Sequence, residues 1–131
     1  MDMEIVFPGG KKVDVAYDGF VINSDQPVEG GGEGSAPSPM ALFLASLGAC
    51  AGYYVLTFCQ NRQIPTEGLR LVQRTLPGPD GKGLGRIEIE VILPPEFPEK
   101  YLKAVARAAD ACAVKKAILN PPEMAVSARR G

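Results

Sequence analysis

The residues of this 131-residue chain best suited to chemistry are its three cysteines, Cys50, Cys59 and Cys112. A cysteine thiolate is a nucleophile and a redox centre, whereas the chain has no histidine to act as the base of a Ser-His or Cys-His hydrolase. The cysteines are odd in number, widely spaced and without a CxxC pair, which disfavours a disulfide framework and a zinc site. We therefore expect either thiol chemistry or simple packing, with no metal and no cofactor.

Spacing limits which cysteines can meet. Cys50 and Cys59 lie in an uncharged run over residues 34–61. In a helix they would lie on opposite faces, roughly 13 Å apart along the axis, while a disulfide needs Cα atoms within about 7 Å. Cys112 lies in a second, alanine-rich segment, so it can meet Cys50 where two helices cross. The alternative is that each cysteine is a small buried hydrophobe, and spacing leaves both interpretations open.

Short β-rich runs open the chain, at residues 3–7, 11–17 and 20–23. Asp18-Gly19 separates the last two and is a strong signal for a two-residue hairpin turn. These runs predict an antiparallel meander. The Gly- and Pro-rich residues 26–39 follow, and we expect them to form a mobile surface loop.

The uncharged run has the start signals of a helix. Ser38 supplies an N-cap oxygen and Pro39 suits the first helical position, while Ile64-Pro65 requires an end near residues 60–62. Residues 69–76 and 86–93 predict a second hairpin, because the latter run alternates apolar side chains with glutamates.

A second helix should begin at Pro98, with a break near Cys112, and a short strand over residues 124–128 should follow it. The predicted order is β-β-β-α-β-β-α-β. This is an α+β fold in which helices pack on an antiparallel sheet, in a single domain over residues 1–131.

The uncharged run is long enough to cross a bilayer, and Gly48 and Gly52 have the small-residue spacing of membrane helices. Much of it is only weakly apolar, however, no basic cluster closely flanks it, and a span would split the sheet. We expect instead a long buried central helix, with Gly48 and Gly52 allowing close backbone contact. A domain this small hardly surrounds such a helix alone, which indicates a homodimer.

The net charge and the amino-terminal residues argue against two classes of protein, nucleic-acid-binding proteins and secreted proteins. The net charge is −1 and the basic residues are scattered, which disfavours nucleic acid as a partner. Acidic residues stand in MDMEIVFPGGKK where a signal peptide carries basic ones. We therefore expect a cytoplasmic protein.

Two motifs resemble those of the OsmC/Ohr family, the osmotically inducible protein C and organic hydroperoxide resistance proteins. APSPMALFLASLGAC, residues 36–50, resembles the loop that leads into the family's central helix and its reactive cysteine. ACAVKKAIL, residues 111–119, resembles the Cys-Pro-Val motif of the second helix, with Ala113 in place of proline. The similarity covers nearly the whole chain and implies an intertwined α+β homodimer with two sites at its interface.

The resemblance implies a thiol-dependent peroxidase that reduces organic hydroperoxides in oxidative-stress defence. The Cys50 thiolate would attack the peroxide and become a sulfenic acid, Cys112 would condense with it to a disulfide, and a thiol reductant would restore both. Cys59 would have no role. Apolar side chains near Cys50 would favour alkyl peroxides over hydrogen peroxide; these are Phe43, Leu47, Tyr53 and Tyr54.

The charged residues of the family's peroxidases are missing here. Those proteins carry a glutamate that orients an arginine beside the thiolate, but Ala41 stands at the glutamate's place and no arginine precedes Arg62. A thiol in an apolar helix has a raised pKa unless a cation or several donors offset its burial. Candidate substitutes for the missing cation are Lys11 or Lys12 from the meander and Arg70 or Arg74 from the partner chain, and Glu29 or Glu33 in the loop would assist them.

Two other functions fit the same residues. A non-catalytic module could hold an apolar ligand, and its binding would survive Cys50→Ser. A redox sensor would instead form the Cys50–Cys112 disulfide slowly and without recycling.

Overall fold

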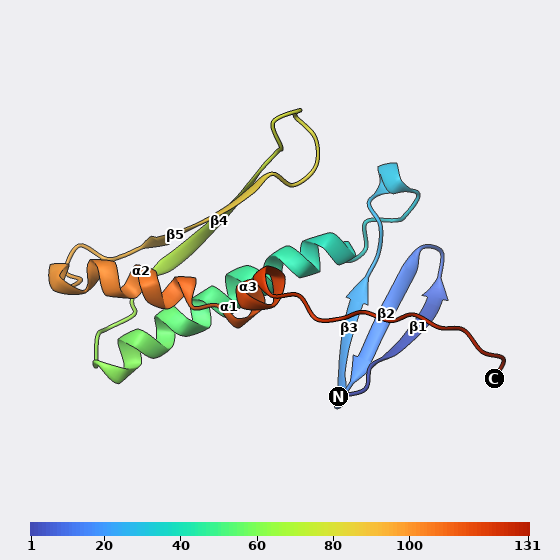
Figure 1. The fold of residues 1–131 in the computed structure, drawn as a ribbon, viewed down its shortest axis with the longest axis horizontal. Coiled ribbons are helices and arrows are strands. Elements are labelled where there is room, and N and C mark those ends of the chain that lie inside the picture. The colour runs from blue at the N-terminus through green and yellow to red at the C-terminus, as the bar shows by residue number, and fades with distance from the viewer. The chain divides into compact units, whose positions relative to one another are not determined.

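A computed structural model describes residues 1–131, which form two compact units, Met1–Ala45 and Ser46–Gly131. Each unit is described by itself. The chain forms small antiparallel sheets and three α-helices, the α+β class predicted from the sequence, and Figure 1 shows their order along the chain. The single domain over residues 1–131 stays a prediction.

The first unit contains a three-stranded antiparallel sheet in the order β1-β2-β3. Asp18 and Gly19 have positive φ angles of 46° and 82°, and Tyr17 pairs with Phe20 across them. This geometry confirms the predicted two-residue turn. The strands are β1 (Glu4–Gly9), β2 (Lys12–Tyr17) and β3 (Phe20–Ser24).

A buried carboxylate anchors the loop after β3, which includes the 3₁₀ turn η1 (Val28–Gly30). Asp25 is 1% exposed and accepts hydrogen bonds from the Ser35 hydroxyl at 2.6 Å and the Ser35 N–H at 3.1 Å. The N–H groups of Gln26 and Glu33 also donate to it, at 2.7 and 3.3 Å. The bonds from Ser35, followed by those from Gln26 and Glu33, lower the pKa of Asp25 to about 2. The loop over residues 26–39, which the sequence predicts to be mobile, is therefore held in place by hydrogen bonds to Asp25.

Helix α1 (Pro39–Asn61) begins in the first unit and continues into the second. The Ser38 hydroxyl accepts a hydrogen bond from the N–H of Ala41 at 3.2 Å, which confirms the predicted N-cap. The second unit continues with the hairpin β4 (Arg70–Leu76) and β5 (Arg86–Ile92), the 3₁₀ turn η2 (Glu99–Tyr101), and helices α2 (Leu102–Asp110) and α3 (Ala113–Leu119).

The break between α2 and α3 falls at Ala111 and Cys112, as predicted. The prediction of a strand over residues 124–128 is wrong, because residues 120–131 form no helix or strand. A strand exists only while its backbone pairs with a neighbouring strand, and this segment has no such partner within the chain.

The core of the second unit joins α1 and α2 to the β4–β5 hairpin. Its buried members are Val55, Phe58, Cys59, Phe97 and Val105, and side chains of both strands pack against them. Burial raises the pKa of the Cys59 thiol, which identifies it as a packing residue.

Gly48 and Gly52 of α1 differ in how closely other parts of the chain approach them. A Cβ atom added at Gly48 would lie 3.1 Å from Oε1 of Gln73, so this glycine lets a β4 side chain, and not a second backbone as predicted, approach the helix closely. No atom lies within 4 Å of the corresponding point at Gly52, which therefore permits no close contact within one chain.

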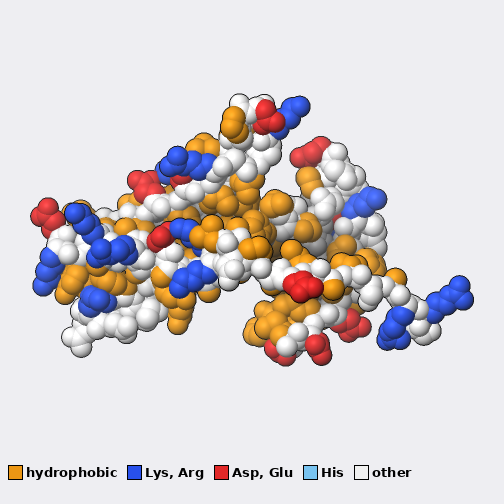
Figure 2. All heavy atoms as spheres, viewed as in Figure 1, with side chains coloured by type: hydrophobic (Ala, Val, Ile, Leu, Met, Phe, Trp, Pro, Cys, Tyr) orange, Lys and Arg blue, Asp and Glu red, His pale blue; other side chains and the backbone are white.

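Helix α1 is long and apolar enough to cross a membrane by length and composition, and 28% of its most apolar stretch is buried within the chain. The buried residues form a stripe that starts at Leu47 and continues through Ala51 and Val55 to Phe58. Other large apolar side chains of the helix stay exposed, among them Tyr53 at 62%. Figure 2 shows hydrophobic side chains at the surface of both units. The predicted complete burial of this helix is thus only partial in a single chain.

The Asp25 carboxylate predicts a specific acid sensitivity. Its pKa is about 2 in the folded protein and about 3.9 in an unfolded chain, so its contribution to stability is present above pH 4 and disappears as the pH falls towards 2. We expect Asp25→Asn to lower the thermal unfolding midpoint at pH 7, and the difference from the parent protein to shrink below pH 4. Asp2→Asn is the matched control. A difference that does not change between pH 7 and pH 2 would contradict this assignment.

Candidate active site

The structure brings Cys50 and Cys112 together. Cys50 lies half-buried on α1, and Cys112 is 2% exposed and forms the N-cap of α3. The Cys112 thiol lies within hydrogen-bonding reach of two acceptors, the Cys50 sulfur and the carbonyl oxygen of Leu47 at 3.9 Å. The sequence could only suggest that these two thiols meet where helices cross.

The first turn of α3 directs its free N–H groups at the two sulfurs. Such groups have no partner within their own helix and need another acceptor. The N–H groups of Ala113 and Val114 donate to the Cys50 sulfur. The N–H of Lys115 donates to the Cys112 sulfur at 3.4 Å. This arrangement follows from the chain break, since Cys112 leaves the helical conformation at ψ 124° and a new helix, α3, starts directly after it.

These donors lower the pKa of Cys50. The N–H of Val114 has the largest effect, burial opposes it, and the Cys112 thiol and the N–H of Ala113 add to it. Within one chain, a thiolate at Cys50 is thus stabilised by uncharged donors.

Within one chain, the groups that shift this pKa include no lysine or arginine, and the predicted contribution of Arg70 or Arg74 from a partner chain stays a prediction. Lys12 pairs with Glu33 at 2.7 Å, and Arg74 pairs with Glu90 at 2.9 Å. Sequence reasoning missed Ala113 and Val114 because their contribution comes from the main chain. The available signal was the absence of proline at position 113, which leaves an N–H there.

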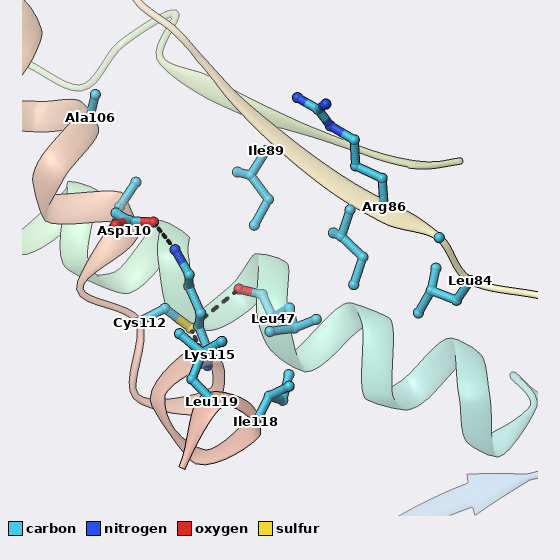
Figure 3. A pocket seen from close by; sticks show the side chains of 13 residues that line it. Leu47, Leu84, Arg86, Ile89, Ala106, Asp110, Cys112, Lys115, Ile118 and Leu119 are labelled. Atoms are coloured by element: carbon cyan, nitrogen blue, oxygen red, sulfur yellow. Dashed lines mark hydrogen bonds and ion pairs between the residues drawn. The ribbon is translucent and has the colours of Figure 1, made fainter. Parts of the chain in front are cut away.

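A cavity of about 540 Å³ lies beside Cys112, between α1, α2, α3 and the β5 end of the hairpin (Figure 3). Three charged residues take part in its lining. Lys115 is paired with Asp110, and Arg86 is paired with Glu88 at 2.9 Å. The remaining wall is mostly aliphatic and includes Leu47, Leu84, Ile87, Ile89, Ile118 and Leu119.

The apolar surroundings of the site differ from those expected. Of the four side chains predicted near Cys50, only Leu47 lines the cavity. Tyr53 and Tyr54 instead pack edge to face, with ring centroids 5.4 Å apart. They follow Cys50 by three and four residues, so they neighbour it along the α1 surface. No group of three or more His, Cys, Asp or Glu side chains is placed to hold a metal ion.

Comparisons with known proteins agree on one family. Residues 32–127 match the family model described as OsmC-like protein. An OsmC-like protein from Mycoplasma pneumoniae is 18% identical, with a TM-score of 0.70 over 92% of this chain and 87% of that one. An organic hydroperoxide resistance protein OsmC from Legionella pneumophila is 25% identical, with a TM-score of 0.58 over 90% and 89%.

A third structure, an organic hydroperoxide resistance protein from Elizabethkingia anophelis, is 20% identical with a TM-score of 0.63 over 92% of this chain and 90% of that one. A search of curated proteins gives no match.

The donor role of α3 predicts the effect of removing one N–H. Proline suits the first position of a helix and the extended conformation of Cys112 before it, so Ala113→Pro should preserve the fold. We expect it to raise the pKa of Cys50, measured as the pH dependence of alkylation in a protein that also carries Cys59→Ser and Cys112→Ser. Ala113→Gly keeps the N–H and is the matched control. Identical titrations of the two variants would show that this N–H does not stabilise the thiolate.

Proposed function

The chain belongs to the OsmC-like protein family, and from the contact between Cys50 and Cys112 we propose that it is a thiol-dependent peroxidase that reduces organic hydroperoxides. Membership of the family, together with organic hydroperoxide resistance proteins among its structural neighbours, supports a peroxide-related redox role. The observation that carries the finer assignment is the hydrogen-bonded pair of sulfurs, of which Cys50 has a lowered pKa.

The Cys50 thiolate begins the proposed reaction. It attacks the outer oxygen of the hydroperoxide, so that an S–O bond forms and the O–O bond breaks. The departing alkoxide takes a proton and leaves as an alcohol, and Cys50 becomes a sulfenic acid. The N–H groups of Ala113 and Val114 hold the attacking sulfur in its anionic form.

Cys112 completes the oxidative half of the cycle. Its sulfur attacks the sulfenic sulfur of Cys50, an S–S bond forms, and the hydroxyl group leaves as water with the Cys112 proton. The hydrogen bond between the two side chains favours this step, because the second thiol is already next to the first. A thiol reductant then returns both cysteines to their reduced forms, with two electrons and two protons.

The surface of α1 favours an apolar peroxide. Cys50 is half-buried, and Tyr53 and Tyr54 follow it at i+3 and i+4 on α1, which makes them its neighbours on the helix surface. An alkyl tail packed on these rings would gain about 0.8 kcal/mol for each CH₂ group removed from water, which hydrogen peroxide cannot gain.

We also propose that the protein is a cytoplasmic homodimer. A single chain leaves apolar side chains of α1 and of the first sheet in solvent, and such surfaces mark protein interfaces. The most exposed are Phe7, Phe20, Val21 and Tyr53, together with Met40. A second copy of the chain is the occupant that would complete the burial of α1.

The dimer predicts a particle of twice the 13.9 kDa chain mass in light scattering after gel filtration. Leu56→Arg places a charge on the exposed side of α1 and should weaken the association at least tenfold, since one buried Leu contributes about 1.5–3 kcal/mol. Val126→Arg, in the exposed terminal segment, is the control. A single-chain mass at micromolar concentration would contradict the dimer.

Peroxidase activity can be tested with purified, reduced protein, cumene hydroperoxide and dithiothreitol. We expect steady consumption of peroxide that Cys50→Ser abolishes, because this variant lacks the attacking sulfur. Without dithiothreitol, Cys112→Ser should consume one equivalent of peroxide to form the Cys50 sulfenic acid and a second to form the sulfinic acid, and Cys59→Ser should behave like the parent.

Turnover by Cys50→Ser would contradict the mechanism. Slow disulfide formation without turnover would identify a redox sensor. An inert Cys50 that resists alkylation in the folded protein would identify a binding module.

A further inference from the structure

Helix α3 directs two N–H groups at the Cys50 sulfur, yet the hydrophobic core does not hold this helix in place. None of its side chains is buried, and none belongs to the core that joins α1, α2 and the hairpin. Its first turn must nevertheless keep a fixed position, because a hydrogen bond weakens steeply when its geometry changes. Polar contacts at the break between α2 and α3 are therefore the contacts to consider.

An ion pair crosses this break. The ammonium group of Lys115, the third residue of α3, contacts the carboxylate of Asp110, the last residue of α2. Figure 3 shows this contact as a dashed line beside Cys112. The main-chain N–H of Lys115 also donates to the Cys112 sulfur at 3.4 Å. Lys115 is thus bound to the end of α2 by its side chain and to the N-cap of α3 by its backbone.

Both charges of the pair lie where their own helices disfavour them. The dipole of a helix places negative partial charge at its last turn and positive partial charge at its first turn. Asp110 adds a carboxylate to the last turn of α2, and Lys115 adds an ammonium group to the first turn of α3. Each charge alone would destabilise its helix, and each has the other as its counter-charge. The connection between the two helices therefore explains this placement, and neither helix explains it alone.

We propose that the Asp110–Lys115 ion pair is a positioning device, which holds the first turn of α3 with its N–H groups directed at the Cys50 sulfur. The inference rests on the proposed function, in which Cys50 is the sulfur that attacks the peroxide. Asp110 and Lys115 are positioning residues, because they act on that sulfur through the backbone of α3.

The two charges act through position and not through their own electrostatic field. Within one chain, the groups that shift the pKa of Cys50 include neither Lys115 nor Asp110, and those that lower it are uncharged donors of α3 and its N-cap. Arg86, the other charged residue of the adjacent cavity wall, is paired with Glu88 on β5. A change at the ion pair is therefore expected to reach Cys50 through the placement of α3.

Charge reversal at the ion pair separates position from field. Lys115→Asp leaves two carboxylates facing each other across the break, and Asp110→Lys leaves two ammonium groups. The two side chains are 43% and 69% exposed, so the fold should tolerate both changes. We expect each variant to react with iodoacetamide at Cys50 about threefold more slowly than the parent at pH 7, the range of an exposed ion pair, and equally fast at pH 10. Peptide mass spectrometry identifies the alkylated cysteine.

The double variant, Lys115→Asp with Asp110→Lys, restores the pair with its charges exchanged. We expect it to recover the parental rate at pH 7. Lys116→Asp makes the same change of charge at the next residue of α3 and is the matched control, with the parental rate expected. Asp110→Asn removes the attraction without creating repulsion and should also slow the reaction, so it replaces a reversal that prevents folding.

Opposite effects of the two single reversals would overturn the inference, because a direct field slows the reaction in one variant and speeds it in the other. A double variant as slow as the single ones, or single variants as fast as Lys116→Asp, would also overturn it. These outcomes do not depend on turnover. A parent protein that does not consume cumene hydroperoxide contradicts the proposed function, whereas parental alkylation rates in all variants contradict only the role of the ion pair.

Discussion

The hydrogen bonds from the first turn of α3 to two sulfurs are the interaction on which the site depends. Every helix begins with N–H groups that lack an acceptor, and burial makes an unpaired donor costly. Here Ala113 and Val114 donate to Cys50, and Lys115 donates to Cys112. The same bonds fix α3 against α1 and hold the two thiols in contact. The break at residues 111 and 112 is what creates this helix start, so the interruption of the second helix has a chemical consequence.

Uncharged donors stabilise a thiolate differently from a cation. A surface lysine or arginine loses influence as salt screens it, and its long side chain must be held in place at a cost in entropy. Main-chain N–H groups of Ala113 and Val114 are already fixed by the helix and need no reorganisation when charge appears. The missing glutamate and arginine therefore do not leave Cys50 without support. The thiolate is stabilised instead by main-chain N–H groups of α3, whose effect depends on the backbone geometry of that helix.

Local signals account for what could be predicted from the sequence. Ser38 and Pro39 define the start of α1, Asp18-Gly19 defines a turn, and the break near Cys112 separates two helices, because each depends on neighbouring residues alone. The strand expected over residues 124–128 failed because pairing needs a distant partner. The N–H donors of α3 and the cavity walls were missed for a related reason. They arise when segments more than 60 residues apart meet, and no side-chain pattern records which main-chain groups then face a sulfur.

The two cysteines to which the proposed reaction assigns different roles also lie in different surroundings. Cys50 lies half-buried beside the tyrosines of α1, whereas Cys112 faces an aliphatic cavity lined by α3 and β5. In the proposed reaction, the hydrogen bonds that lower the pKa of Cys50 keep its sulfur in the anionic form that attacks the peroxide. The same turn of α3 also holds Cys112 next to Cys50, so one structural element serves both the attack and the disulfide formation that follows it.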